Sequence, residues 1–278
     1  MPAPGAIGPR TSEAERHMST TMSGPNRMQI RVMPCDWGGA GVEDIGAVLR
    51  SAAAELLRYT PGLLVIPISV QHRGQGYPET LPHRSVDGNI VIVLNAQGHH
   101  WAQFAYQFIH ELCHVLSNHA QVLPSEERWF DEAVCEAASL FTLLGMARTW
   151  ESSPPYPNWS DYAAGLRDYA HTALNEGHRR LRPGTDLAHW YEQQRGHLRE
   201  DRYWREGTEL VANQLLPLFM TEPSAWEAIK YLNVGGTEPR PSFEAHLSAW
   251  YAASPVRLRQ FVSRIASLFG LCMGRIPG

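Results

Sequence analysis

The spacing of apolar and polar positions divides the chain into a short β-rich part and a long helical part. Residues 28–33 form a short β-like run, and residues 42–59 carry apolar side chains at helical spacing. Two further apolar runs, 63–70 and 89–95, predict strands, and Pro67 favours an edge position for the first of them. The pattern therefore predicts a small mixed α/β unit in this region.

Farther along the chain the apolar spacing becomes helical. A stripe of apolar residues over 101–116 predicts a long buried helix, and a break at Pro124 separates it from a second helix over 126–147, which Gly145 is expected to end. A proline-rich linker follows at 152–158. Further helices are predicted at 162–180, 187–195, 203–220, 225–232 and 255–268. The expected fold class is α+β: an α/β N-terminal unit with an edge strand, a two-helix core and an all-α C-terminal subdomain.

Composition adds a domain plan and excludes some partners. The chain is 44% hydrophobic and 19% charged, which is typical of a globular protein with a sizeable core. Residues 1–27, rich in Pro, Gly, Ser and Thr, are expected to be a disordered leader, followed by an α/β subdomain at 28–150 and a helical subdomain at 151–278. A formal net charge of −4 favours neither nucleic acid nor a membrane surface as partner. Four cysteines without a Cys-x-x-Cys pair favour reduced thiols and a cytoplasmic location.

The first long helix contains a motif with chemical meaning, His110-Glu111-Leu112-Cys113-His114. At 3.6 residues per turn His110 and His114 lie roughly 40° apart on one helix face, so both imidazoles can reach one metal ion. Glu111 lies about 100° from His110, where a carboxylate can take a proton from a water activated by zinc. This His-Glu-x-x-His spacing is typical of zinc metalloproteases.

A catalytic zinc site needs a third protein ligand, and the second helix offers candidates. Glu132 and Glu136 are separated by one helical turn, so they share a face of an otherwise apolar helix. Two acids that face inward require a cation, whereas the same pair on a solvated face would be hydrated and would need no partner.

Taken with the segment Trp129-Phe130-Asp131-Glu132-Ala133, the motif resembles the gluzincin metallopeptidases, the thermolysin-like and aminopeptidase-like zinc enzymes. The resemblance covers roughly residues 89–145. It implies that Glu132 is the third zinc ligand, that Glu111 is the general base and acid, and that Glu136 orients one ligand histidine. It also implies that strand 89–95 is the edge strand that pairs with the substrate backbone.

Outside that region the likeness to the gluzincins is weaker. The resemblance implies a Tyr or His from the helical part that stabilises the oxyanion, and Tyr203 is the candidate, with Tyr191, His189 and His197 as rivals. The Gly-x-Met-Glu-Asn segment that anchors a substrate amine in the aminopeptidases is missing before the motif, so exopeptidase specificity has no support.

The sequence thus predicts a zinc-dependent metallopeptidase that acts on a peptide or protein substrate, with Zn²⁺ as cofactor. Two alternatives stay open: a non-catalytic gluzincin-like module that binds peptides or proteins, and a zinc hydrolase for a small non-peptide substrate. The sequence indicates neither the cleavage specificity nor the oligomeric state.

Overall fold

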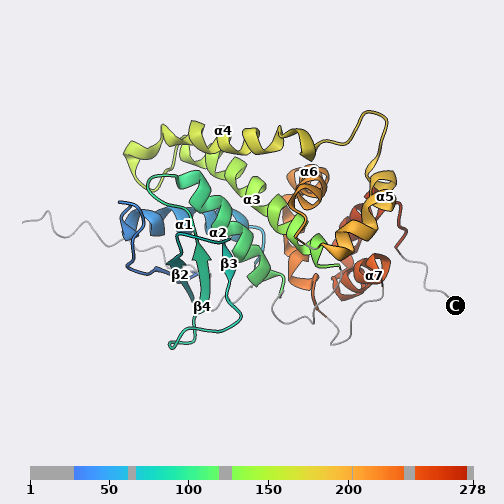
Figure 1. Cartoon of the computed structure of the whole chain (residues 1–278), viewed down its shortest axis with the longest axis horizontal. Coiled ribbons are helices and arrows are strands. Elements are labelled where there is room, and N and C mark those ends of the chain that lie inside the picture. The colour runs from blue at the N-terminus through green and yellow to red at the C-terminus, as the bar shows by residue number, and fades with distance from the viewer. Residues whose placement is uncertain (1–27, 62–66, 119–126, 202, 235–241, 274–278) are drawn as a thin grey trace, which may run out of the picture.

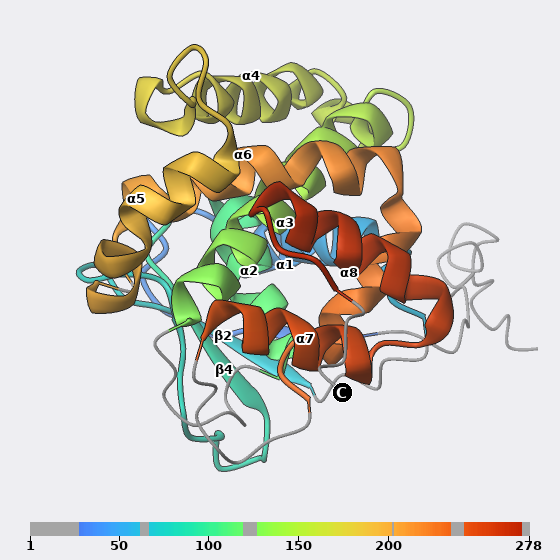
Figure 2. The same cartoon turned by 90° about the vertical axis from the view of Figure 1, so that its right-hand side faces the viewer.

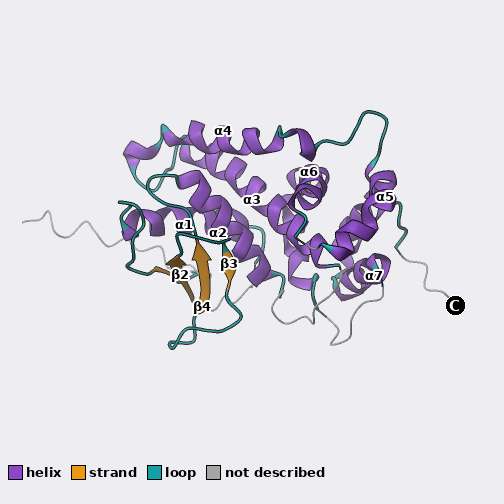
Figure 3. Ribbon diagram, viewed as in Figure 1, coloured by secondary structure: helices purple, strands orange, loops and turns teal. Residues whose placement is uncertain are grey.

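The structure is a computed structural model that describes residues 28–61, 67–118, 127–201, 203–234 and 242–273. The expected leader at 1–27 and the predicted break at Pro124 lie outside these ranges. As expected, the chain combines both kinds of secondary structure: a small sheet lies at one end of the molecule, and helices form the rest (Figure 3).

Four strands form the sheet in the order β1-β2-β4-β3. Strands β1 (Ile30–Val32), β2 (Ile68–His72) and β4 (Ile90–Leu94) are parallel, whereas β3 (Glu79–Thr80) runs antiparallel to β4. Helix α1 (Val42–Leu57) makes the crossover that a parallel β1–β2 pair requires. Helices α1 and α2 (Trp101–Leu116) pack against each other and against the strands (Figure 1).

The edge positions of the sheet differ from the prediction. Strand 89–95, expected at the edge, is internal as β4, and β2 is also internal in spite of Pro67. Pro67 lies one residue before β2, so its missing N–H interrupts no ladder. All five residues of β4 are buried, as in a strand covered on both faces. The edge strands are β1 and, beside β4, β3, whose two residues are too few to produce an alternating pattern.

Helix α3 is the longest of the described helices and contacts helices from both halves of the chain. It spans Arg128–Trp150 and packs against α1 and α2 and, on other sides, against α4 (Tyr162–Leu174) and α6 (Arg205–Thr221) (Figure 1). The predicted end at Gly145 is wrong, because the helix continues through this residue. A Cβ at Gly145 would lie 3.0 Å from the Glu55 carboxylate of α1, so this glycine permits a close approach of the two helices.

The C-terminal part is helical, as predicted, with different boundaries. Its elements are η3 (Pro157–Trp159), α4 (Tyr162–Leu174), η4 (Gly177–Arg179), α5 (Leu187–Glu200), α6 (Arg205–Thr221), η5 (Pro223–Tyr231), α7 (Phe243–Ala253) and α8 (Val256–Leu268). Helix α7 was not predicted, although Ser242 caps it by accepting a hydrogen bond from the Ala245 N–H.

Aromatic side chains join α3 to the last two helices. Trp129 and Phe130 pack on Phe243 of α7 with ring centroids 4.8 and 5.1 Å apart, and both contact Phe269 after α8. In Figure 2, α7 and α8 lie on the side of the molecule that faces the viewer. None of the described helices combines the length and apolar character needed to cross a bilayer.

The core side of α2 provides a test of the fold. Phe108 is fully buried and, at about 100° per residue, lies about 160° from His110 and about 120° from His114 around α2. Replacing Phe108 by Ala should lower the free energy of unfolding by about 3–5 kcal/mol, measured by urea denaturation. The fully exposed Val86 is the control: Val86→Ala should change stability by less than about 0.5 kcal/mol. A loss under about 1 kcal/mol for Phe108→Ala would contradict this packing.

Candidate metal centre

The two motif histidines and Glu132 meet where α2 packs on α3. His110 and His114 occupy successive turns of α2, with ring centroids 5.0 Å apart. Their Nε2 atoms lie 3.0 and 3.4 Å from the same atom, Oε2 of Glu132. We call these three residues the His/Glu group. The side chains of His110 and Glu132 are each 20% exposed, so the group can be reached from solvent.

The geometry of the His/Glu group fits a zinc ion. Its three donor atoms all lie within 4.8 Å of one another. A tetrahedral ion with bonds of about 2.1 Å holds its ligand atoms about 3.4 Å apart, close to the two separations from Glu132 Oε2. Two imidazole nitrogens and one carboxylate oxygen are also a donor set that catalytic zinc uses, with the fourth position left for water. The predicted ligands are therefore together, in an arrangement that could hold this metal.

Mutual attraction shifts the pKa values in this group. Burial lowers the pKa of His114, but the adjacent Glu132 carboxylate outweighs this effect and raises the pKa to about 10. Burial likewise raises the pKa of Glu132, and the imidazoles of His114 and His110 more than reverse that shift, so the pKa lies well below its usual range. Without metal, the proton on His114 therefore provides the positive charge between these side chains.

Glu111, the predicted general base, is buried beside the edge strand. Oγ1 of Thr80 in β3 donates a hydrogen bond to Oε2 of Glu111 at 2.9 Å and approaches the Glu111 backbone oxygen at 3.3 Å. Thr80 therefore limits the rotation of the carboxylate and links it to the sheet. Thr80 was not predicted, because the stretch 71–88 has no periodicity that indicates a strand.

The second ring nitrogen of each histidine faces α3. Nδ1 of His114 lies 3.3 Å from Sγ of Cys135, and Nδ1 of His110 lies 4.0 Å from Oε2 of Glu136. Glu136 thus faces the second nitrogen of His110, and its orienting role stays a prediction. Cys113 and Cys135 are buried, and all four cysteines, each within the described residues, are free thiols.

Two residues beside Glu136 were not predicted. The Tyr106 hydroxyl donates a hydrogen bond to Oε1 of Glu136, and Nη1 of Arg179 contacts the same oxygen at 2.7 Å. Burial and the Glu136 charge raise the pKa of Tyr106 well above its usual value, against the opposing effect of Arg179. Tyr106 lies one turn before His110, so helical spacing could have indicated it. Arg179 lies far along the chain and has no such signal.

The structure does not place Tyr203 within a helix. It lies on the connection between α5 and α6, two residues before α6 begins, and is 67% exposed. Among its rivals, Tyr191 is buried against Trp129 and Phe243, and the His197 ring stacks on Trp204 at 4.1 Å. The oxyanion role of Tyr203 stays a prediction.

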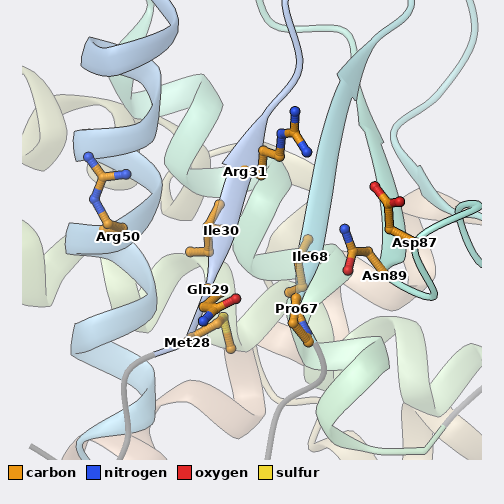
Figure 4. Close-up of a pocket in the computed structure, with 9 residues that line it drawn as sticks. All are labelled: Met28, Gln29, Ile30, Arg31, Arg50, Pro67, Ile68, Asp87 and Asn89. Carbon is orange, nitrogen blue, oxygen red and sulfur yellow. The ribbon is translucent and has the colours of Figure 1, made fainter.

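A separate hollow of about 530 Å³ lies where β1, β2 and β4 begin (Figure 4). Its polar lining includes Arg31, Arg50, Asp87 and Asn89. None of its lining residues is a histidine, cysteine or glutamate, so it lacks the donor set of the His/Glu group.

Comparisons with known proteins add no further constraint, since no protein-family model, curated protein or solved structure matches this chain.

Zinc content tests the His/Glu group directly. Purified protein dialysed against zinc should contain about one zinc per chain by plasma mass spectrometry. Glu132→Ala should lose most of it, because removing a ligand costs more affinity than the roughly 10–100-fold lost with a supporting residue. The matched control is Glu192→Ala, an exposed acid on α5, which should keep its zinc. Wild-type protein that stays metal-free would contradict the site.

The pKa of His114 predicts that zinc uptake releases a proton. A histidine with a pKa of about 10 is protonated at pH 7.5, and zinc needs its neutral form. Calorimetry in buffers of different ionisation enthalpy should therefore show about one proton released per zinc, and the apparent affinity should rise about tenfold per pH unit between pH 6.5 and 8. His189→Gln, an exposed histidine on α5, should leave both results unchanged. Binding without proton release would contradict this charge arrangement.

The raised pKa of His114 also predicts how the stability of the metal-free protein changes with pH. Because the pKa of His114 is raised on folding, its contribution to stability is complete below pH 6.5 and disappears as the pH rises through about 10.

Proposed function

We propose that the protein is a zinc-dependent metallopeptidase that hydrolyses peptide bonds. The observation that carries this proposal is the convergence of His110 Nε2, His114 Nε2 and Glu132 Oε2 at separations that suit zinc, with Glu111 next to His110 in the helix. A purely structural zinc site has no need of an extra carboxylate beside it, so Glu111 favours catalysis over a binding module.

Zinc held by the His/Glu group would lower the pKa of water toward 7 and polarise the scissile carbonyl. Glu111 would accept a proton from the attacking water as its oxygen bonds to the carbonyl carbon. The same residue would then deliver that proton to the amine nitrogen as the C–N bond breaks. Thr80 would hold the Glu111 carboxylate in one orientation through both steps.

The gluzincin resemblance belongs to this proposal, with one change. The strand that would pair with an extended substrate is β3, because β4 has neighbours on both sides. The assignment of 28–150 as a catalytic subdomain, of 151–278 as a helical subdomain, and of a cytoplasmic location also belongs here. In this proposal the hydroxyl of Tyr203, on the α5–α6 connection, would stabilise the oxyanion that forms on the substrate carbonyl.

Replacing the proposed base separates chemistry from metal binding. Glu111→Gln should retain about one zinc per chain and lower peptide turnover by roughly 10²–10⁴-fold, because the amide cannot accept the proton. Turnover is measured by mass spectrometry on a broad peptide library. Glu151→Gln, an exposed acid beyond the end of α3, should cleave like the wild type.

Three outcomes would contradict the proposed function or a part of it. Unchanged turnover in Glu111→Gln would eliminate Glu111 as the base. Peptide binding without cleavage by the zinc-loaded wild type would favour the non-catalytic module, and hydrolysis confined to small esters or amides would favour the non-peptide hydrolase.

A further inference from the structure

A chain of polar contacts leads from His110 into the C-terminal helical part. Nδ1 of His110 faces Oε2 of Glu136 at 4.0 Å, and the other oxygen of Glu136 contacts Nη1 of Arg179 at 2.7 Å. The Arg179 side chain, on η4, is only 2% exposed. A buried guanidinium is therefore two contacts away from a proposed zinc ligand that lies 69 positions earlier, at 110 against 179.

The two oxygens of Glu136 have different partners. Oε1 accepts hydrogen bonds from both Tyr106 and Arg179, which leaves Oε2 directed toward the imidazole of His110. Nε2 of that ring faces Glu132, so Nδ1 is the nitrogen available to Glu136. At 4.0 Å this carboxylate is within ion-pair range of Nδ1 rather than hydrogen-bond distance, and its charge on that side favours the tautomer with the proton on Nδ1 and Nε2 free for a metal.

We propose that Arg179 is a positioning residue for the metal centre, which fixes Glu136 and through it the ring of His110. This inference rests on the proposed function, since it concerns the same zinc site. Arg179 contacts no proposed ligand itself and acts only through Glu136.

The surroundings of Arg179 show why an arginine is required here. Its Nη2 contacts Oε1 of Glu209 on α6 at 3.0 Å, and its Nε contacts Oε2 of Glu176 at 3.0 Å. One planar guanidinium thus joins three carboxylates from different segments, which the single ammonium of lysine cannot reproduce. A buried cation is tolerated only when it is paired in this way.

Glu176, His178 and Glu209, around Arg179, resemble a second metal site but are better explained as partners in ion pairs. Ligand atoms of Glu176, His178 and Glu209 lie within 4.8 Å of one another. However, Oε1 of Glu209 already contacts both Arg179 and Arg205, and these two positive charges disfavour a metal cation. This cluster therefore supports Arg179 rather than a second ion.

A double-mutant cycle tests the route through Glu136. The zinc dissociation constant is measured by competition with a chromophoric chelator for wild type, Arg179→Met, Glu136→Gln and the double variant. Arg179→Met should weaken zinc binding about tenfold. In the Glu136→Gln background the same change should add less than about twofold, because its intermediary is already altered. The visible spectrum of the cobalt(II)-loaded protein should change in Arg179→Met, since it reports ligand geometry.

Stability controls separate positioning from general damage. Leu258→Ala removes a buried side chain of α8, an element outside the site, and should lower the urea midpoint of unfolding without changing zinc affinity or the cobalt spectrum. Arg167→Gln removes an exposed, paired arginine and should leave both unchanged. Should Arg179→Met fail to fold, Arg179→Lys and Tyr106→Phe provide a second test. Each weakens the hydrogen bonds to Oε1 of Glu136 and should weaken zinc binding.

The outcomes distinguish this inference from the proposed function. A wild type that binds no zinc overturns the metal site itself. A wild type that binds zinc, with equal affinity in the folded Arg179 and Tyr106 variants, overturns only the positioning role. A full tenfold loss for Arg179→Met in the Glu136→Gln background overturns the route through Glu136.

Discussion

The contact between α2 and α3 brings together residues that the chain itself separates, and the His/Glu group depends on it. Small side chains on α3 permit this contact. Ser139 donates a hydrogen bond to the Tyr106 backbone oxygen of α2 at 2.9 Å. Because the backbones approach this closely, the short Glu132 side chain reaches both histidines. A bulky residue in place of Ser139 would separate the helices and the donor atoms with them.

This packing buries ionisable side chains, and the attraction between their charges compensates for the cost of burying them. Burial alone favours the neutral form of both Glu132 and His114. Their mutual attraction reverses both tendencies, so that the carboxylate stays ionised and the imidazole stays protonated. One positive charge is thus held among three donor atoms whose separations already suit zinc. Exchange of that proton for a metal ion would require little movement of the side chains, which is the physical meaning of a preorganised site.

The parts of the site that the sequence could predict are those that depend on local geometry. One helical turn separates His110 from His114, so their common face follows from spacing alone. The choice of Glu132 rather than Glu136 as the third ligand depended on the family resemblance, because helical spacing alone does not distinguish the two glutamates. Thr80 and Arg179 could not be predicted: a two-residue strand has no periodicity, and the position of Arg179 depends on how η4 packs against α6. The edge strand was misplaced for the same reason, because pairing with β3, rather than the apolar run itself, decides that β4 is internal.

The two unpredicted residues act on opposite sides of the site. Thr80 connects Glu111 to the sheet, and Arg179 connects His110, through Glu136, to the C-terminal helices. The proposed base and one proposed metal ligand are therefore supported by separate parts of the molecule, although they are adjacent in α2. A displacement of the edge strand would alter the base first, whereas a displacement of η4 or α6 would alter the ligand first. The geometry of the candidate metal centre thus depends on contacts from the sheet and from the C-terminal helices, both packed on α2 and α3.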